Sequence, residues 1–305
     1  MSGLPFKALN RRDMPDEERY VWVVGTMIVC ALLFASTWVL SNTVPIVKRQ
    51  FAKFDFKNRC DWCSRTASVV HANVVLYYLW QETLYNVEWN EWFQTTSNLS
   101  VLERNMCISA GYFLYDLTVV LASRMDLWQI FVFHHVAALW PLLFVLFGGC
   151  ENYAFFGSGY FFVEMTILPL QLVHWCETLK KPNSWIAALG YHLTFWLWLP
   201  FRLVIPVYMT YNGIGVVMQG DDTVGFWQCK LPVGQGGVAI WAFCWLIFAA
   251  HIGPGYYKRV VKGEQPNEHP APKKKPAAPK KTAGKKETPA SPMSPVMSPT
   301  FKASS

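Results

Sequence analysis

The strongest constraint on the fold is the apolar segment 111–141, which carries ionisable side chains within a hairpin of two long hydrophobic arms. The arms, 106–122 and 127–147, are each close to the length that crosses a bilayer as a helix. A polar turn of four residues, 123–126, joins them. Because so short a turn forces the arms to run antiparallel, the segment predicts two neighbouring membrane spans.

Three ionisable residues lie within this hairpin: Asp116 on the first arm, and the adjacent pair His134 and His135 on the second. Counted from Met125, Asp116 is nine residues back and His134 nine residues on, which puts both roughly 13 Å inside the same membrane face. Ionisable groups are costly in hydrocarbon, so inside a span they indicate a functional site by default. Adjacent residues of a helix point about 100° apart, so one histidine can face Asp116 while the other meets a substrate.

The composition indicates a membrane protein throughout. Of 305 residues, 52% are hydrophobic and only 15% are charged, whereas about a quarter is usual in soluble domains. The net charge of +7 comes mostly from the C-terminal tail, so it does not indicate a nucleic-acid partner. We expect an all-α, polytopic membrane protein with about seven transmembrane helices, at 21–44, 66–81, 106–122, 127–147, 153–175, 184–210 and 238–256.

Four parts of the chain follow from these spans. Residues 1–19 are polar, 20–44 form the first transmembrane helix, and 60–257 hold the six further helices. The tail, 263–305, is rich in Lys, Pro, Ala and Ser and cannot bury enough apolar surface to fold. We expect a disordered, solvated tail, although its lysines could also contact an anionic lipid surface.

Basic residues in the short loops predict the orientation in the membrane. The loop 45–65 carries six Lys or Arg residues and lies on the same side as the tail, whereas the opposite side is poorer in them. We therefore expect the C-terminus to be cytosolic and the N-terminus lumenal. Asn98 begins the triplet Asn-Leu-Ser and would be a lumenal glycosylation site. Cys150 and Cys229 also fall on the lumenal side, where they could form a disulfide or stay free.

Further polar side chains occur at a similar depth in other spans. His71, His192 and His251 each lie roughly 9 to 12 Å from the expected cytosolic face, and Glu164 lies deeper. Two interpretations remain open. These groups could hold helices together through hydrogen bonds between spans, each worth on the order of 0.6 kcal/mol. Alternatively, they could line a functional pocket together with Asp116.

The spacing of these residues resembles the TLC-domain family of membrane proteins. That family includes the TRAM proteins, the ceramide synthases and several less characterised TLC-domain-containing proteins, and this chain looks most similar to the last group. The similarity covers about residues 60 to 255, and the matching positions are Trp62-x-x-Arg65-x-x-Ser68-x-x-His71-Ala72, Gly111-Tyr112-Phe113, Asp116-Leu117, His134-His135, Glu164-x-Thr166-x-x-Pro169, Trp175 and Arg202.

The resemblance implies a barrel of six helices around a lipid-holding cavity, with the extra first span outside it, commonly in the endoplasmic reticulum. In ceramide synthases the adjacent histidines are implicated in catalysis, so His134 and His135 are the implied catalytic residues, with Asp116 orienting them. Those enzymes also carry a His-Asp-x-x-Asp segment downstream, where this chain reads Val163-Glu164-Met165-Thr166-Ile167. We expect the following residues to bind lipid or substrate: Arg65, His71, Tyr112, Glu164, His192 and Arg202.

Two functions from different classes follow. The first is a multi-pass membrane protein that binds or handles lipid and so influences membrane lipid homeostasis. The alternative is an acyl-CoA-dependent N-acyltransferase of sphingolipid synthesis, with His134 or His135 as the general base. Acyl-CoA would then be a co-substrate. We expect no cofactor and no metal, since the chain lacks the His-x-x-x-His clusters of di-iron lipid enzymes. The expected partners are membrane lipids, and the chain could form a homo-oligomer.

Overall fold

The computed structural model describes residues 14–81, 99–150, 154–211 and 226–263, and there the chain is almost entirely helical. The chain divides into two compact units, 1–266 and 267–305, and every described residue belongs to the first. The elements of this unit are α1 (Asp16–Thr43), α2 (Pro45–Phe51), α3 (Phe56–Trp80), α4 (Leu99–Ser123), α5 (Trp128–Phe147), α6 (Ala154–Gly159), η4 (Tyr160–Thr166), α7 (Ile167–Thr178), α8 (Trp185–Trp198), η5 (Leu199–Val204), η6 (Phe226–Lys230), α10 (Leu231–Ile247), η7 (Phe248–Ile252), α11 (Gly253–Tyr256) and η8 (Tyr257–Val261).

Several of these helices are long and apolar enough to cross a membrane, so the chain is an all-α, polytopic membrane protein. Within the described ranges five helices qualify: Asp16–Thr43, Ser100–Ser123, Trp128–Phe147, Trp185–Tyr211 and Leu231–Val261. The other two expected spans correspond to α3 and to the segment α6–η4–α7. α3 carries charged residues in its first half, and the second segment passes from α-helix to 3-10 helix and back.

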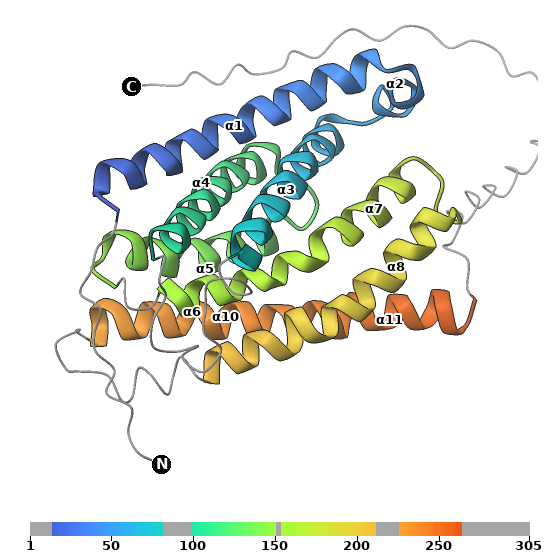
Figure 1. Cartoon of the computed structure of the whole chain (residues 1–305). Coiled ribbons are helices and arrows are strands. Elements are labelled where there is room, and N and C mark those ends of the chain that lie inside the picture. The colour runs from blue at the N-terminus through green and yellow to red at the C-terminus, as the bar shows by residue number, and fades with distance from the viewer. Residues whose placement is uncertain (1–13, 82–98, 151–153, 212–225, 264–305) are drawn as a thin grey trace, which may run out of the picture. The chain divides into compact units, whose positions relative to one another are not determined.

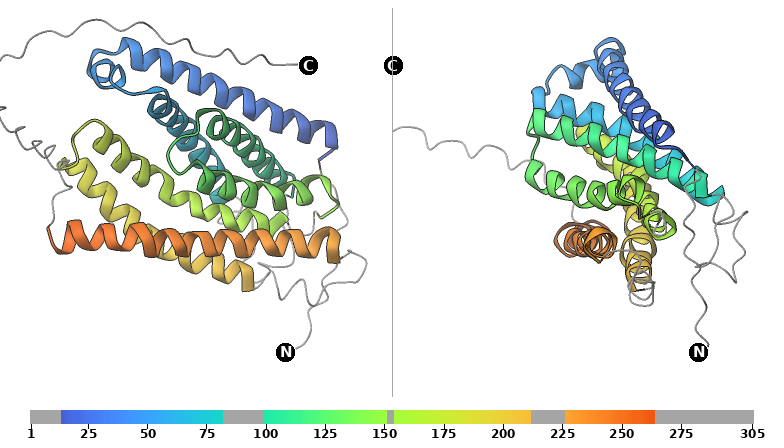
Figure 2. Two further views of the ribbon diagram at one scale, coloured as in Figure 1. Left: turned by 180° about the vertical axis from the view of Figure 1, so that it is seen from behind. Right: turned by 90° about the vertical axis from the view of Figure 1, so that its left-hand side faces the viewer.

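The helices pack side by side, with α4 at the centre. α1 covers α3 and α4, α5 packs against another side of α4, and α10 packs against α5. α7 lies between α3 and α8, and the view along the bundle in Figure 2 shows α1 and α10 at opposite edges. In its most apolar stretch, 67% of the residues of α4 are buried, against 11% for α1. The arm that carries Asp116 is therefore the inner wall of the bundle.

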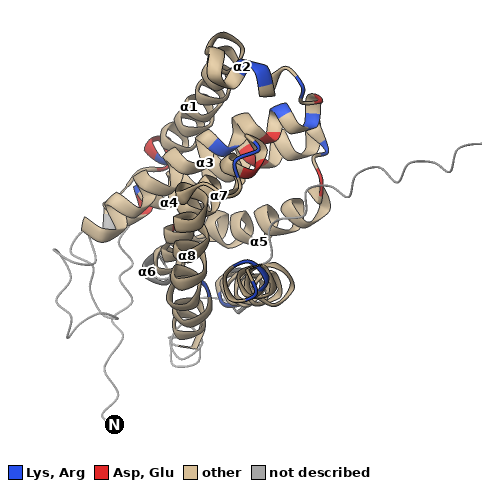
Figure 3. Ribbon diagram, turned by 90° about the vertical axis from the view of Figure 1, so that its right-hand side faces the viewer, with Lys and Arg blue, Asp and Glu red and all other residues tan. Residues whose placement is uncertain are grey.

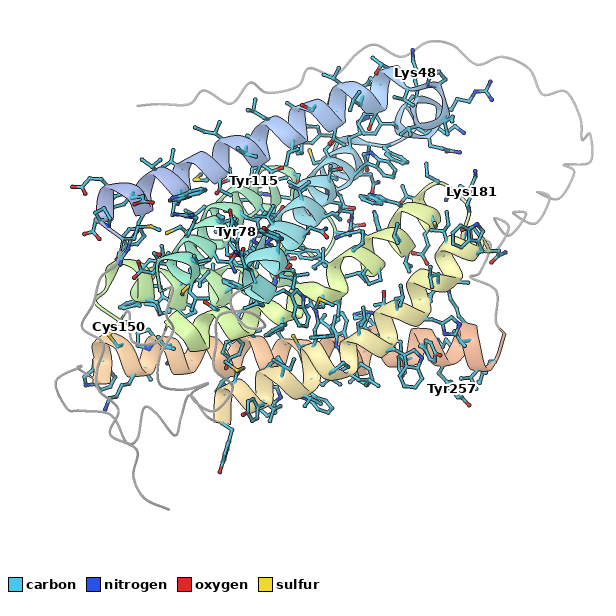
Figure 4. All side chains as sticks on the ribbon, in the orientation of Figure 1. Lys48, Tyr78, Tyr115, Cys150, Lys181 and Tyr257 are labelled. Carbon is cyan, nitrogen blue, oxygen red and sulfur yellow. A yellow bond between two sulfur atoms is a disulfide. The ribbon has the colours of Figure 1, made fainter. Side chains whose placement is uncertain are left out.

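Charged side chains gather toward the ends of the bundle. Figure 3 shows a group of basic residues at α2 and the beginning of α3. Lys48 and Lys181 lie at one end, and Cys150 lies at the opposite end (Figure 4). The connections that follow α1 and α7 thus share one end of the molecule.

α1 lies at the edge of the bundle but is held there by close contacts. A Cβ added at Gly111 of α4 would lie 2.8 Å from the Cβ of Thr26 and against the backbone oxygen of Val23, so the crossing requires glycine. Farther along, the indole nitrogen of Trp62 in α3 donates a hydrogen bond to Ser41 Oγ at 3.0 Å. The first span is therefore docked on the other helices.

The position of Arg19 differs from the expected polar N-terminal segment. α1 begins at Asp16, and Arg19 is fully buried in its first turn. Its Nη2 donates to Glu103 Oε1 at 2.9 Å, and its Nη1 donates to the carbonyl of Leu146. Acidic residues favour a helix N-terminus, so this mixed-charge run begins a helix. One of its cations then ties together α1, α4 and the end of α5.

Two further helices begin earlier than the apolar runs predict. α3 begins at Phe56, ten residues before the expected residue 66, because the side chain of Asp55 caps it by accepting from the backbone N–H of Asn58 at 2.9 Å. α10 begins at Leu231 where residue 238 was expected, with Pro232 in its first turn.

The glycines of α10 serve helix packing. A Cβ added at Gly236 would overlap the ring of Pro141 in α5, and one added at Gly237 would overlap the phenol of Tyr160. The missing side chains therefore allow α10 to approach α5 and η4 closely.

The turn between α4 and α5 is tight. Arg124 and Leu127 have φ angles of 46° and 61°, a left-handed conformation that is rare for residues other than glycine. The N–H of Trp128 donates to the carbonyl of Met125 at 3.0 Å and starts the next helix. The turn confirms the antiparallel hairpin, and it fixes the depth of Asp116 relative to the histidine pair.

Candidate functional site: a histidine pair beside an apolar cavity

His135 and Asp116 form a buried pair across the hairpin. His135 Nε2 lies 2.8 Å from Asp116 Oδ2, and the exposed fractions of the two residues are 3% and 9%. His135 Nδ1 lies 2.6 Å from the carbonyl oxygen of Phe131, one turn earlier in α5. Ser64 of α3 donates its hydroxyl hydrogen to the other carboxylate oxygen of Asp116.

These contacts constrain the proton count of the pair. A carbonyl and a carboxylate both face the imidazole, whereas a neutral imidazole has only one N–H to donate. The pair therefore holds one more proton than a neutral imidazole and a carboxylate would, with His135 as imidazolium or Asp116 as carboxylic acid. In either form the pair is neutral as a unit.

Aromatic rings surround the buried pair. His71 of α3 stacks on Tyr112 with ring centroids 4.0 Å apart, and its Nε2 lies 3.2 Å from Ser109 Oγ. Phe113 contacts the rings of His71 and His135 edge-on, at 5.9 and 5.8 Å. The structure thus brings His71 next to the hairpin residues Tyr112, Phe113 and His135, and these rings form a packed wall.

His134 faces a different environment from its neighbour. Its ring stacks on Phe243 of α10 at 4.6 Å, and its buried Nδ1 has no hydrogen-bond partner among the described residues. His134 lines a partly enclosed cavity of about 50 Å³ that is bounded by α4, α5, α6, η4 and α10. A site needs roughly 10–15 Å³ on this measure to hold one water, so the cavity has room for a small polar group or a segment of an acyl chain.

The lining of this cavity is almost entirely apolar. Ala138, Leu142 and Ile240 are typical of its walls. His134, Tyr160 and Glu164 are the lining residues with polar side-chain atoms in the described part of the chain. Tyr160 is already paired, because its hydroxyl lies 2.6 Å from Thr210 Oγ1. Two polar groups therefore remain available to an occupant, the imidazole of His134 and the carboxylate of Glu164.

Glu164 and Arg202 lie near each other without forming an ion pair. Glu164 is 8% exposed, and no described residue forms a hydrogen bond or an ion pair with its carboxylate. Arg202 is close enough to attract it electrostatically. However, Arg202 Nε donates to Thr166 Oγ1 at 2.6 Å and to the carbonyl of Val163 at 3.1 Å, and its guanidinium lies over the Trp198 ring. Arg202 therefore supports η4 from behind the cavity and is not among the residues that line it.

The structure places Arg65 in a separate cluster at the basic end of the bundle. Arg65 Nε bonds to Asp61 Oδ2 at 2.9 Å, and its Nη1 donates to Gln171 Oε1 at 2.7 Å. His174 Nε2 also lies 3.2 Å from Asp61 Oδ2 and 3.3 Å from Thr178 Oγ1. These contacts join α3 to α7, so Arg65 is occupied in holding two helices together.

His192 does not reach the cavity. It is exposed on α8, and its Nδ1 lies 3.1 Å from the hydroxyl of Tyr256. His251 is exposed as well. These two histidines therefore do not line the cavity, because depth in a span does not determine which way a side chain faces. Within the described residues, no three His, Cys, Asp or Glu side chains are arranged so as to hold a metal ion.

Two further predicted positions, Cys150 and Cys229, lie at the other end of the molecule. The structure joins Cys150, just after α5, to Cys229, just before α10, in a disulfide. The bond links the ends of two neighbouring helices, α5 and α10, that both line the cavity. Asn98 lies outside the described residues.

Two site residues escaped the sequence analysis. Ser64 holds Asp116, and its spacing of four and seven residues from Ser68 and His71 is a helical polar stripe that could have revealed it. Tyr160 lines the cavity next to Gly237, and no pattern in the sequence distinguishes it from other aromatic residues.

Comparison with known proteins identifies the family. The family model of the TLC domain matches residues 61–252. The chain belongs to the TLC-domain family. The TLC match runs from residue 61, in the first half of α3, to the end of η7, so it includes the hairpin, the cavity and the histidine pair.

Curated relatives carry the same domain in their names. TLC domain-containing protein 4-B of Danio rerio is 31% identical over 142 residues, which is 44% of this chain and 51% of the relative. The chain thus spans about half the length of that relative. TLC domain-containing protein 4-B of Xenopus laevis is 29% identical over 77% of this chain and 88% of the relative. TLC domain-containing protein 4 of Xenopus tropicalis is 26% identical over 80% and 93%. No solved structure matches the chain.

Proposed function

We propose that this TLC-domain protein binds or handles a membrane lipid in the cavity beside His134 and thereby influences membrane lipid composition. The observation that carries the proposal is the cavity itself, an apolar space within a membrane bundle with two polar groups available in its wall. Ligand sites are typically of this kind, with a mostly apolar lining and a few polar groups that fix the orientation of the ligand.

The size of the cavity limits what it would hold. About 50 Å³ accommodates the polar end of a lipid and the first part of its chain, but not a whole lipid. Each methylene group moved from water to an apolar wall contributes about 0.8 kcal/mol. A lipid already in the bilayer gains much less from that transfer, so we expect His134 and Glu164 to supply most of the selectivity.

The test fills the cavity with a larger side chain, and the same substitution on the exposed face of α5 is the control. Ala138 is 5% exposed and lines the cavity, whereas Val136 on α5 is 46% exposed. The full chain would be purified in nanodiscs with a photoactivatable lipid. Ala138→Phe should abolish cross-links to peptides of α5, η4 and α10, and Val136→Phe should keep them. Equal labelling of the two variants would count against the proposal.

We also propose that the protein resides in the endoplasmic reticulum, with a lumenal N-terminus and a cytosolic C-terminus. The basic end with Lys48 and Lys181 supports a cytosolic assignment, and the disulfide of Cys150 at the other end suits an oxidising lumen. On this orientation endoglycosidase H should increase the gel mobility of the protein, and Asn98→Gln should abolish that change. Glycosylation at a site engineered into the tail would contradict the orientation.

A second function is favoured by the His135–Asp116 pair. In an N-acyltransferase, His134 would take a proton from the amine as the amine nitrogen attacks the thioester carbonyl of acyl-CoA. The C–N bond forms, the C–S bond breaks, and the proton passes to the leaving thiolate. His135, held by Asp116 and by the carbonyl of Phe131, would keep α5 rotated so that His134 faces the cavity. Lipid binding and acyl transfer would then take place in the same cavity.

Microsomes carrying His134→Ala should lose acyl-CoA-dependent amide formation if this second function is correct. His192→Ala is the matched control, because it removes an exposed histidine that does not reach the cavity. Unchanged amide formation in both variants would leave only the lipid-binding function.

A further inference from the structure

The carboxylate of Glu164 has no hydrogen-bond or ion-pair partner among the described residues. It lies in η4, is more than nine-tenths buried, and lines the cavity that His134 also lines. A buried polar group without a partner is costly, so such groups in native proteins are usually satisfied by a ligand or a water. Glu164 and the imidazole of His134 therefore form an incomplete hydrogen-bonding site.

The charges around this site are already balanced. Asp116 and His135 are neutral as a pair, and the carboxylate of Glu164 is offset by the nearby guanidinium of Arg202. No other ionisable side chain of the described residues, apart from His134 and Tyr160, lines the cavity. A charged headgroup would thus bring an uncompensated charge into an apolar interior, which is expensive.

We propose that Glu164 is a specificity-determining residue that selects a lipid with an uncharged, hydrogen-donating headgroup, such as the hydroxyl of a long-chain alcohol or of a glycerol ester. The inference rests on the proposed lipid-binding function. The ligand hydroxyl donates to the Glu164 carboxylate, and His134 bonds to the hydroxyl oxygen or to a second hydroxyl. A fatty acid is rejected because its carboxylate meets that of Glu164, and an alkylamine because its ammonium would give the already balanced site a net positive charge in an apolar interior.

The experiment compares headgroups on one chain. The full-length protein in nanodiscs would be labelled with three probes of equal length, each with the same diazirine and alkyne on the chain: a primary alcohol, a carboxylic acid and a primary amine. Labelled peptides from α5, η4 and α10 would be counted by mass spectrometry. We expect the alcohol to label these peptides about tenfold more than the acid or the amine, since each of these two probes brings a net charge into the apolar site.

Two variants separate the polar contact from folding. Glu164→Leu should lower labelling by the alcohol about tenfold, to the level of the acid, whereas Glu164→Gln, whose amide oxygen still accepts a hydrogen bond, should stay within about threefold of the parent chain. Glu177→Gln is the matched control, because Glu177 is exposed on α7. Thermal unfolding of each variant shows whether it folds.

The outcomes distinguish this inference from the function on which it rests. Labelling that Ala138→Phe blocks but that is equal for the three headgroups would overturn the role of Glu164 and leave the cavity as a lipid site. Preferential labelling by the amine would likewise overturn it and would favour the N-acyltransferase. Labelling that Ala138→Phe leaves unchanged would remove both the proposed function and the role of Glu164.

Discussion

Two adjacent histidines of one helix lie in opposite environments. His135 is enclosed by partners, since both of its ring nitrogens and both oxygens of Asp116 are hydrogen-bonded. His134, one residue earlier, has an unpaired Nδ1 and faces the cavity together with Glu164. The paired group, Ser64–Asp116–His135, holds three helices at fixed positions, and the unpaired group is free to meet a ligand. The difference predicts that substitutions in the first group cost stability and substitutions in the second cost binding.

The largest effect is expected from breaking the paired group. Asp116→Ala leaves the imidazole of His135 and the hydroxyl of Ser64 without their shared acceptor, which should lower the free energy of unfolding by about 4 kcal/mol. Thermal unfolding in detergent measures this loss. Asp116→Asn keeps an acceptor and is the control, with a smaller loss. A loss below about 1 kcal/mol for the alanine variant would mean that the pair does not hold the helices.

A somewhat smaller effect is expected where the disulfide holds the cavity wall. Replacing Cys150 and Cys229 together by serine removes a link across 79 residues, so the free energy of unfolding should fall by about 3 kcal/mol. The cavity should loosen more than the paired group, because the bond joins α5 to α10. Hydrogen exchange would detect faster exchange at the start of α10 and little change in α4. An equal increase in the hydrogen-exchange rates of α10 and α4 would contradict the distinction between the cavity wall and the paired group.

The cluster at the basic end provides a test through pH. Burial raises the pKa of Asp61, but the hydrogen bond with His174 and the charge of Arg65 outweigh it and lower the pKa from its ordinary 3.8 to about 2. The ionised form is therefore favoured in the folded state. Its stabilisation, about 2 kcal/mol at most, is complete above pH 4 and is lost as the pH falls toward 2. Asp61→Asn should remove this pH dependence of the unfolding temperature. An unchanged pH dependence in the variant would mean that another titratable group causes it.

The smallest effect is expected at Glu164. Glu164→Leu removes a buried carboxylate that has no hydrogen-bond partner among the described residues, so the free energy of unfolding should change by less than about 1 kcal/mol and could rise. Binding should suffer where stability does not. A loss as large as that of Asp116→Ala would show that Glu164 belongs to the paired group and would contradict the comparison.

Much of the fold could be predicted from the hydrophobic pattern. The antiparallel hairpin 106–147 was predicted because a four-residue turn between two apolar runs leaves one arrangement, and the opposite roles of His134 and His135 follow from their separation of about 100° on a helix. The helix beginnings were less predictable. At Phe56 and Leu231 the helices extend beyond their apolar parts, where a capping side chain or a proline decides the first turn.

The parts of the site that could not be predicted depend on which way side chains face. His192 has the right depth but the wrong face, and Arg65 has the right motif but is bound to Asp61 and Gln171. Ser64 and Tyr160 reach the site because of how α3 and η4 pack, and packing between helices distant in sequence leaves no periodic signal. Sequence spacing gives depth, whereas the rotation of each helix comes from its contacts.

The left-handed residues Arg124 and Leu127 have a consequence for changes in chain length. The tight turn cannot absorb an extra residue. One residue inserted before α5 would therefore move each side chain of α5 to the position that the next residue of the unchanged chain occupies. His134 would then replace His135 opposite Asp116, and Phe133 would replace His134 beside the cavity. A deletion would instead put Val136 opposite Asp116. The doubled histidine thus protects the anchoring bond against lengthening but not against shortening, so natural or engineered indels here should be tolerated asymmetrically.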